Sequence, residues 1–244
     1  MKTQKLLTLF LLLTTLALCS ACSKLDEGIG ITGQGPMLEE THQTGSYKNI
    51  EVDVDADVFL TQGDTQPLLI SGQSNILSNL NISVSEMTLR INYIENVNTH
   101  ERLQIYINLP NLENLSTARG AHIRSLNTFN TNHMIIQVYG SGTISMDIED
   151  AEEISTSVTG SGYITLNGKS HELKVVISGP GYVATSGLVT KYGNVWIKGS
   201  GKCEVNSIDE LTVNINGNGK VLYAGNPNTL ISHLSGNGEL RSIE

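Results

Sequence analysis

A glycine pair that recurs through the second half of the chain decides the fold. It appears as Gly140-Ser141-Gly142, Gly160-Ser161-Gly162, Gly179-Pro180-Gly181, Gly199-Ser200-Gly201, Gly217-Asn218-Gly219 and Gly236-Asn237-Gly238. The first glycines of successive pairs lie 20, 19, 20, 18 and 19 residues apart. Six occurrences at so even a spacing indicate a repeat architecture.

Apolar residues flank every glycine pair at fixed positions. Two residues before the pair stand Val138, Val158, Ile177, Ile197, Ile215 and Leu234, and two residues after it stand Ile144, Ile164, Val183, Cys203, Val221 and Leu240. Their immediate neighbours are mostly polar, so the pattern predicts two short strands around a tight bend, each with one inward face. A propeller blade needs about 40 residues, so this period favours an all-β solenoid, a β-helix with coils of 18 to 20 residues.

The preceding residues, 46–115, alternate less regularly. We expect them to form irregular β coils that share one domain with the regular repeats of residues 116–244. Asp53, Asp55 and Asp57 read as the solvent-facing side of a strand with Lys or Arg neighbours. Their spacing also mimics the start of a calcium-binding EF-hand loop, but Val58 stands where that loop needs glycine.

The N-terminus has the layout of an export signal. Two lysines precede an uncharged run from Leu6 to Leu18, and Cys19-Ser20-Ala21-Cys22 follows. This resembles the lipobox of bacterial lipoproteins, with Cys19 replacing the usual apolar residue. We therefore expect residues 1–21 to be a lipoprotein signal peptide, Cys22 to carry the lipid, and residues 22–45 to be a tether. The expected location is the cell envelope, anchored to the outer membrane and facing either side of it.

Composition narrows the function further. The chain has 244 residues, 24 glycines, 5% aromatic residues and a formal net charge of −9. Glycine-rich, aromatic-poor composition agrees with many tight turns around a thin Val, Ile and Leu core. The negative charge disfavours binding to nucleic acid or to anionic lipid surfaces.

No pattern of catalytic or cofactor-binding residues is readable. The glycine pairs lack the helix that follows a nucleotide-binding loop. The histidines lack zinc-site spacing; they are His42, His100, His122, His133, His171 and His233. Cys203 occupies an inward column, so we interpret it as a buried filler rather than a nucleophile. We therefore expect neither a metal nor another cofactor.

Two features point to partners. Tyr163 and Tyr182 occupy the same outward position of adjacent repeats, which makes them a candidate ligand-contact column for a glycan or a protein, although stacking that only shields the corners is the simpler interpretation. An open solenoid end leaves strand edges that pair readily with another chain, so we also expect a homo-oligomer.

Several segments together resemble the auto-transporter adhesin head GIN domain family of bacterial secreted or lipid-anchored β-helices. They are Tyr47-Lys48-Asn49-Ile50-Glu51-Val52, Val58-Phe59-Leu60-Thr61-Gln62-Gly63, Leu109-Pro110-Asn111-Leu112-Glu113-Asn114-Leu115, the six glycine corners, and Val221-Leu222-Tyr223-Ala224-Gly225-Asn226-Pro227. At Arg119-Gly120-Ala121-His122 an expected glycine corner has lost its form. The resemblance implies a right-handed helix and, by the family's label, adhesion; it brings no catalytic residues.

The leading hypothesis is thus a non-enzymatic, lipid-anchored adhesin or surface-binding module of the cell envelope. One alternative is a carbohydrate-active enzyme on the same scaffold, which requires clustered carboxylates in an outward groove. The other is a purely structural lipoprotein that associates only with itself.

Overall fold

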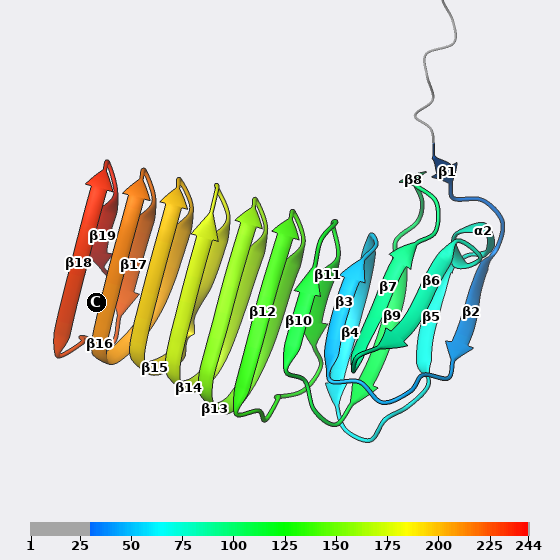
Figure 1. The fold of residues 1–244 in the computed structure, drawn as a ribbon, viewed down its shortest axis with the longest axis horizontal. Helices are drawn as coiled ribbons and strands as arrows, with labels where there is room; N and C mark the ends of the chain where they lie inside the picture. The colour runs from blue at the N-terminus through cyan, green and yellow to red at the C-terminus, as the bar shows by residue number, and fades with distance from the viewer. Residues whose placement is uncertain (1–29, 244) are drawn as a thin grey trace, which may run out of the picture.

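The described chain is a stack of β coils along one axis (Figure 1). The computed structural model describes residues 30–243, so the predicted signal peptide and Cys22 lie outside the described residues. The first elements are β1 (Ile31–Thr32), β2 (Met37–His42), β3 (Asn49–Asp53), β4 (Ala56–Gln62), β5 (Leu68–Gln73), α2 (Ser74–Leu77), β6 (Leu80–Ser85), β7 (Thr88–Tyr93), β8 (Val97–Thr99) and β9 (Leu103–Leu109). The later strands are β10 (Asn114–Thr117), β11 (His122–Ser125), β12 (His133–Gly140), β13 (Thr143–Gly160), β14 (Tyr163–Ser178), β15 (Tyr182–Gly199), β16 (Lys202–Gly217), β17 (Lys220–Ala224), β18 (Thr229–Gly236) and β19 (Glu239–Ser242).

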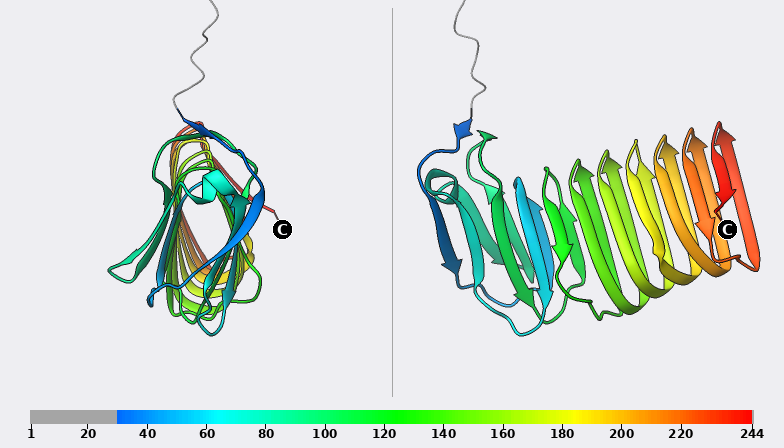
Figure 2. Two further views of the ribbon diagram at one scale, coloured as in Figure 1. Left: turned by 90° about the vertical axis from the view of Figure 1, so that its right-hand side faces the viewer. Right: turned by 180° about the vertical axis from the view of Figure 1, so that it is seen from behind.

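The repeats stack in parallel and in register, as the spacing predicts. Val138 pairs with Val158, and the same column continues through Ile177, Ile197, Ile215 and Leu234. In Figure 1 the near strands ascend and the far strands descend while the chain advances from right to left, which is a right-handed turn. Viewed along the axis, the regular coils superpose (Figure 2). The all-β, right-handed solenoid is therefore confirmed.

The two inward columns form the core. Their members are buried through every inner coil, and Cys203 is fully buried between Val183 and Val221 on the neighbouring coils. Burial raises the pKa of the Cys203 thiol, so the group stays protonated. Its interpretation as a core filler is confirmed.

Two different contacts explain why each corner needs both glycines. The first glycine of every pair has a positive φ; at Gly217 it is 126°, and a Cβ there would lie 2.5 Å from the carbonyl oxygen of Gly199 one coil earlier. The second glycine lies over an inward side chain of the preceding coil. At Gly181 a Cβ would lie 2.4 Å from Cγ1 of Val158. The first glycines thus stack backbone on backbone, and the second glycines leave room for the inward side chains of the preceding coil.

The first coils are irregular, as expected, but begin earlier than predicted. The axial stack extends in parallel from β10 to β3 and β7, and from β11 to β4 and β9. Antiparallel strands then close it: β6 pairs with β7, while β5 pairs with β9 and β2. Within the segment predicted to be a tether, β1 pairs with β8, and β2 pairs with β5. The predicted tether is therefore too long. The sequence did not reveal β2, because its mostly exposed side chains show no clear apolar alternation.

Candidate functional site

The structure brings the predicted tyrosine column together. Tyr163 and Tyr182 are in register on β14 and β15, with ring centroids 4.9 Å apart and planes tilted by 39°. Lys202 continues the column on β16, and its Nζ lies 4.7 Å from the centroid of the Tyr182 ring. The Tyr182 ring therefore has a neighbour on each side along the axis.

The Tyr182 hydroxyl is also engaged within the chain. It donates a 2.6 Å hydrogen bond to Oε1 of Glu204, which also accepts a 2.7 Å bond from Nζ of Lys202. Burial, together with the bond to Glu204, raises the pKa of Tyr182 to about 12. Since this side chain is satisfied by its own chain, Tyr163 is the member of the column better placed to contact a ligand.

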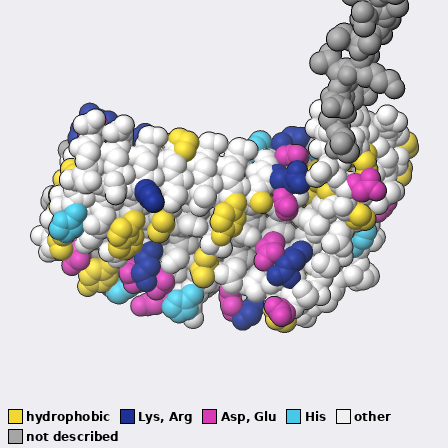
Figure 3. Space-filling model, turned by 45° about the horizontal axis from the view of Figure 1, so that its top comes forward, with side chains coloured by type: hydrophobic (Ala, Val, Ile, Leu, Met, Phe, Trp, Pro, Cys, Tyr) yellow, Lys and Arg dark blue, Asp and Glu magenta, His cyan; other side chains and the backbone are white. Residues whose placement is uncertain are grey.

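A second outward aromatic side chain lies on the other long face of the solenoid. Trp196, the one tryptophan of the chain, follows Val176 and precedes Asn214 and His233 in a single outward column. Trp196 is 41% exposed and Val176 is 42% exposed. Figure 3 shows apolar side chains spaced along the regular coils, and pairs of acidic and basic side chains over the first coils.

The surface around Trp196 is a shallow hollow of about 590 Å³. Lys198, Asn214 and Asn216 contribute polar groups to its lining. Within residues 30–243, neither asparagine side chain hydrogen-bonds another protein group; Asn214 is half-exposed and Asn216 is exposed. A half-exposed indole beside free amides can bind a flat apolar surface and hydroxyl groups together. We call this surface, comprising Val176, Trp196, Lys198, Asn214 and Asn216, the tryptophan face.

The tryptophan face was not predicted from the sequence, although the pattern around Trp196 contains a signal for it. Val195 and Ile197 are buried, so the period of two places Trp196 outward. Val176 and Trp196 are neighbours in one outward column, and adjacent exposed apolar side chains mark an interaction surface more clearly than a single one does.

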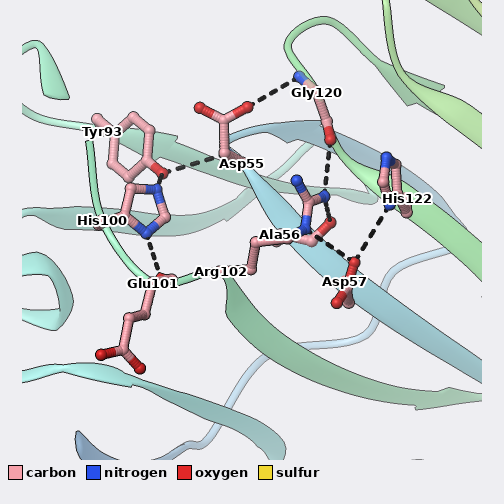
Figure 4. Close-up of polar contacts among 9 residues, drawn as sticks. All are labelled: Asp55, Ala56, Asp57, Tyr93, His100, Glu101, Arg102, Gly120 and His122. Carbon is pink, nitrogen blue, oxygen red and sulfur yellow. Dashed lines mark hydrogen bonds and ion pairs between the residues drawn. The ribbon is translucent and has the colours of Figure 1, made fainter. Parts of the chain in front are cut away.

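The acidic residues of the first coils form a polar network at a corner (Figure 4). Arg102 donates to Oδ1 of Asp57 at 3.0 Å, to the carbonyl oxygen of Ala56 at 2.9 Å and to that of Gly120 at 2.8 Å. Arg119 donates to Oδ1 of Asp53 at 3.0 Å. The predicted basic neighbours are thus present.

The position of these acids corrects one prediction. β3 ends at Asp53 and β4 begins at Ala56, so the three acids surround a bend instead of lining one strand face. Oδ1 of Asp55 accepts a 3.1 Å bond from the backbone N–H of Gly120, on the neighbouring coil that lacks a regular glycine corner. Within the described residues no group of three or more His, Cys, Asp or Glu side chains is arranged to hold a metal ion.

Tyr93 and His100 complete the network in Figure 4. The Tyr93 hydroxyl accepts a 3.2 Å bond from the backbone N–H of Asp55 and lies 2.6 Å from Nε2 of His100. Nδ1 of His100 lies 2.5 Å from the carbonyl oxygen of Glu101. Burial raises the pKa of Tyr93 to about 12, which opposes a role as a base or nucleophile near neutral pH. The contacts instead fasten the loop before β9 to the corner.

The acidic side chains of Glu153 and Glu172, on the regular coils, form ion pairs with Lys174. Nζ of Lys174 lies 2.9 Å from Glu153 and 3.4 Å from Glu172. The hydrogen bond from Lys174 lowers the pKa of Glu153, and the one from Lys202 lowers the pKa of Glu204. A glycosidase needs one carboxylic acid that remains protonated, so these lowered pKa values oppose that chemistry.

No helix among residues 30–243 is long and apolar enough to span a membrane.

Coils stacked by glycine corners around an apolar interior define a right-handed parallel β-solenoid. The chain belongs to the family described as "Putative auto-transporter adhesin, head GIN domain", whose profile matches residues 46–227. No curated protein matches the sequence.

Solved structures agree on the fold. A "putative adhesin" from Bacteroides fragilis is similar with a TM-score of 0.79 at 19% identity, covering 88% of this chain and 100% of that one. A "putative adhesin" from Parabacteroides distasonis gives a TM-score of 0.70 at 20% identity, with 88% and 100% covered. A "Putative lipid binding protein" from the same species gives 0.72 at 21% identity, with 88% and 99% covered. At these identities the likeness shows the fold alone.

Proposed function

We propose that this chain is a non-enzymatic, lipid-anchored adhesin of the cell envelope that binds a saccharide on the tryptophan face. The observation that carries the proposal is the exposed Trp196 beside the unpaired amides of Asn214 and Asn216. A pyranose ring offers an apolar face for the indole and hydroxyl groups for the amides. The family's name supports an adhesive role.

The scaffold favours a saccharide over an extended peptide. β14 and β16 pair with both edges of β15, so no peptide can add to β15 as a further strand. Recognition there must use side chains, whose spacing is fixed by the parallel ladder. A rigid platform of this kind lowers the entropy cost of binding.

Attachment to the membrane rests on the lipobox resemblance at Cys22, which lies outside the described residues. Seven residues lie between Cys22 and Gly30, and the eight steps that join their Cα atoms could reach at most about 28 Å. A Cys22→Ala variant expressed in a Gram-negative host should lose incorporation of labelled fatty acid and leave the membrane fraction. Continued labelling of that variant would contradict the anchor.

The ligand is tested with the chain beginning at Ser23, which retains every described residue, on arrays of glycans and extracellular-matrix proteins. We expect glycan binding that Trp196→Ala weakens by at least about tenfold. Tyr139→Ala is the matched control, because Tyr139 is another exposed aromatic residue, on β12. A blank array, or unchanged binding by Trp196→Ala, would contradict the tryptophan face.

The tyrosine column is tested in the same experiment. Loss of binding in Tyr163→Ala or Tyr182→Ala, with Trp196→Ala unaffected, would place the ligand on that column instead.

Incubating any bound glycan with the protein and analysing it by mass spectrometry tests for catalysis. A released or shortened product would favour the carbohydrate-active enzyme over the non-enzymatic adhesin.

A further inference from the structure

The last described coil has an open edge. β18 pairs with β16 and β19 pairs with β17, and within residues 30–243 no strand pairs with their outer edges. Leu230 and Leu234 occupy inward positions yet are 42% and 46% exposed. Their partners one coil earlier, Leu211 and Ile215, are buried. Within the described residues, the interior of the solenoid is therefore uncovered at this end.

The opposite end is covered. Helix α2 lies over the first coils, and its Ile76 and Leu77 are buried in the core. Figure 2 shows this helix at the end of the stack, whereas the final coil has no such cover. A second copy stacked head to tail would therefore meet a helix and not an open leucine interior, which disfavours continued growth of a fibre.

β18 also lacks the usual protection of an edge strand. Natural edges are commonly blocked by lysine, proline or a bulge. The strand Thr229–Gly236 contains no Lys, Arg, Asp, Glu or Pro, and His233 is its one titratable side chain. Its uncharged backbone edge fits another strand.

We propose that two copies of this chain join at their last coils, with β18 pairing antiparallel to β18 of the second copy about a two-fold axis. An isologous contact of this kind uses the same edge in both copies and closes on itself, so it gives a dimer. The occupant of the edge is thus another copy of the same strand.

Strand periodicity selects the register. Side chains opposite one another in an antiparallel pair share a face, so an axis through a residue keeps inward positions opposite inward positions. An axis through Ser232 places Leu230 opposite Leu234 of the second copy, twice by symmetry. It also places Ile231 opposite His233 of the second copy, on the outer face. This register joins the two apolar interiors.

Light scattering after size exclusion tests the dimer, using the chain beginning at Ser23 over about 1 to 100 μM. We expect a dimer that Ile231→Lys weakens at least tenfold in its dissociation constant, because the charge enters the shared edge. Ile135→Lys is the matched control. Ile135 lies in the same outward column and has similar exposure, 44% against 39%, but β12 is paired on both sides. Circular dichroism confirms that both variants fold.

A cysteine scan tests the register. Ser232→Cys should form a disulfide-linked dimer under mild oxidation, whereas Thr229→Cys should not, because Thr229 lies opposite Ser235 of the second copy. Cys203 is buried and does not interfere. A monomer at every concentration, or equal loss of the dimer in Ile135→Lys, would overturn the proposal. Neither readout depends on a saccharide, so the dimer can fail while the proposed function stands.

Discussion

The regular coils and the first coils stabilise their corners with different contacts. In the regular coils, the first glycines of the corners, such as Gly199 and Gly217, stack backbone on backbone. In the first coils, Asp55, Arg102 and Gly120 hold the bend through side-chain hydrogen bonds. A corner made of backbone repeats identically from coil to coil, whereas a corner made of side chains must be built individually.

This difference affects where polar chemistry can serve recognition. At the first corner, Arg102 and Tyr93 are used to hold the chain together. Along the regular coils, backbone contacts hold the corners, so outward side chains such as those of Trp196 and Asn214 are free for other uses. The comparison therefore favours the regular coils as the binding region.

The largest expected effect comes from breaking a backbone corner. Gly217→Ala should lower the free energy of unfolding by about 3 to 5 kcal/mol, because the new Cβ meets the Gly199 carbonyl and the residue must keep a positive φ. Urea denaturation followed by circular dichroism measures the change. Gly63→Ala is the control, since nothing lies within 4 Å of a Cβ there. A loss below about 1 kcal/mol in Gly217→Ala would mean that the corners can shift to accommodate a side chain.

A smaller effect is expected at the side-chain corner. Arg102→Met keeps much of the aliphatic stem but leaves the carbonyl oxygens of Ala56 and Gly120 without this donor. We expect a loss of about 1 to 2 kcal/mol by the same urea assay. Arg124→Met is the comparison, because Arg124 lies over the Phe59 ring and donates no hydrogen bond to this corner. Equal losses in both variants would show that the carbonyl contacts contribute little.

The smallest effect concerns Tyr93 and its response to pH. Tyr93→Phe removes the hydroxyl contacts to Asp55 and His100 and should cost about 1 kcal/mol near neutral pH. The folded-state pKa of Tyr93 is about 12, above its ordinary value of 10.0. The folded chain therefore holds the phenolic proton more tightly, and this stabilisation is full below pH 10 and is lost as the pH rises towards 12.

Urea midpoints measured between pH 9 and pH 12 test this expectation. The decline in stability of Tyr93→Phe should be shallower than that of the unaltered chain. Tyr139→Phe is the comparison variant, because it removes a phenol at an exposed position that makes no contact with Asp55 or His100. A slope in Tyr93→Phe identical to that of the unaltered chain would contradict the tyrosine's part in the alkaline transition.

Sequence reasoning works best where one interaction repeats. The glycine pairs and the flanking apolar columns predicted the register from Val138 to Leu234, because both follow from local periodicity. The closing strands were harder. β2 pairs antiparallel with β5, about thirty residues away, and its exposed side chains carry no periodic signal. Contacts of this kind depend on the fold as a whole.

The candidate sites show the same contrast between features that local periodicity predicts and contacts that depend on the whole fold. Register alone places Tyr163 beside Tyr182, but it does not reveal that Glu204 and Lys202 engage the Tyr182 side chain. Nor does it reveal that Arg102, Asp55 and Gly120 meet at one bend, since their separation in sequence gives no local pattern. Side-chain partners between distant segments required the three-dimensional structure.

Because parallel strands repeat at a fixed spacing, the number of coils sets the distance of an outward side chain along the solenoid axis. On the outer face the column containing Trp196 runs from Glu51 one strand at a time through Ser116, Gln137, Ser157 and Val176, with Arg90 beside Glu51 on β7, the strand before it in the stack. At roughly 4.8 Å a step, these five steps place the indole about 24 Å along the axis. Gain or loss of one whole coil would move the indole by a single increment and leave its immediate surroundings unchanged, so the reach of this protein can evolve separately from its chemistry.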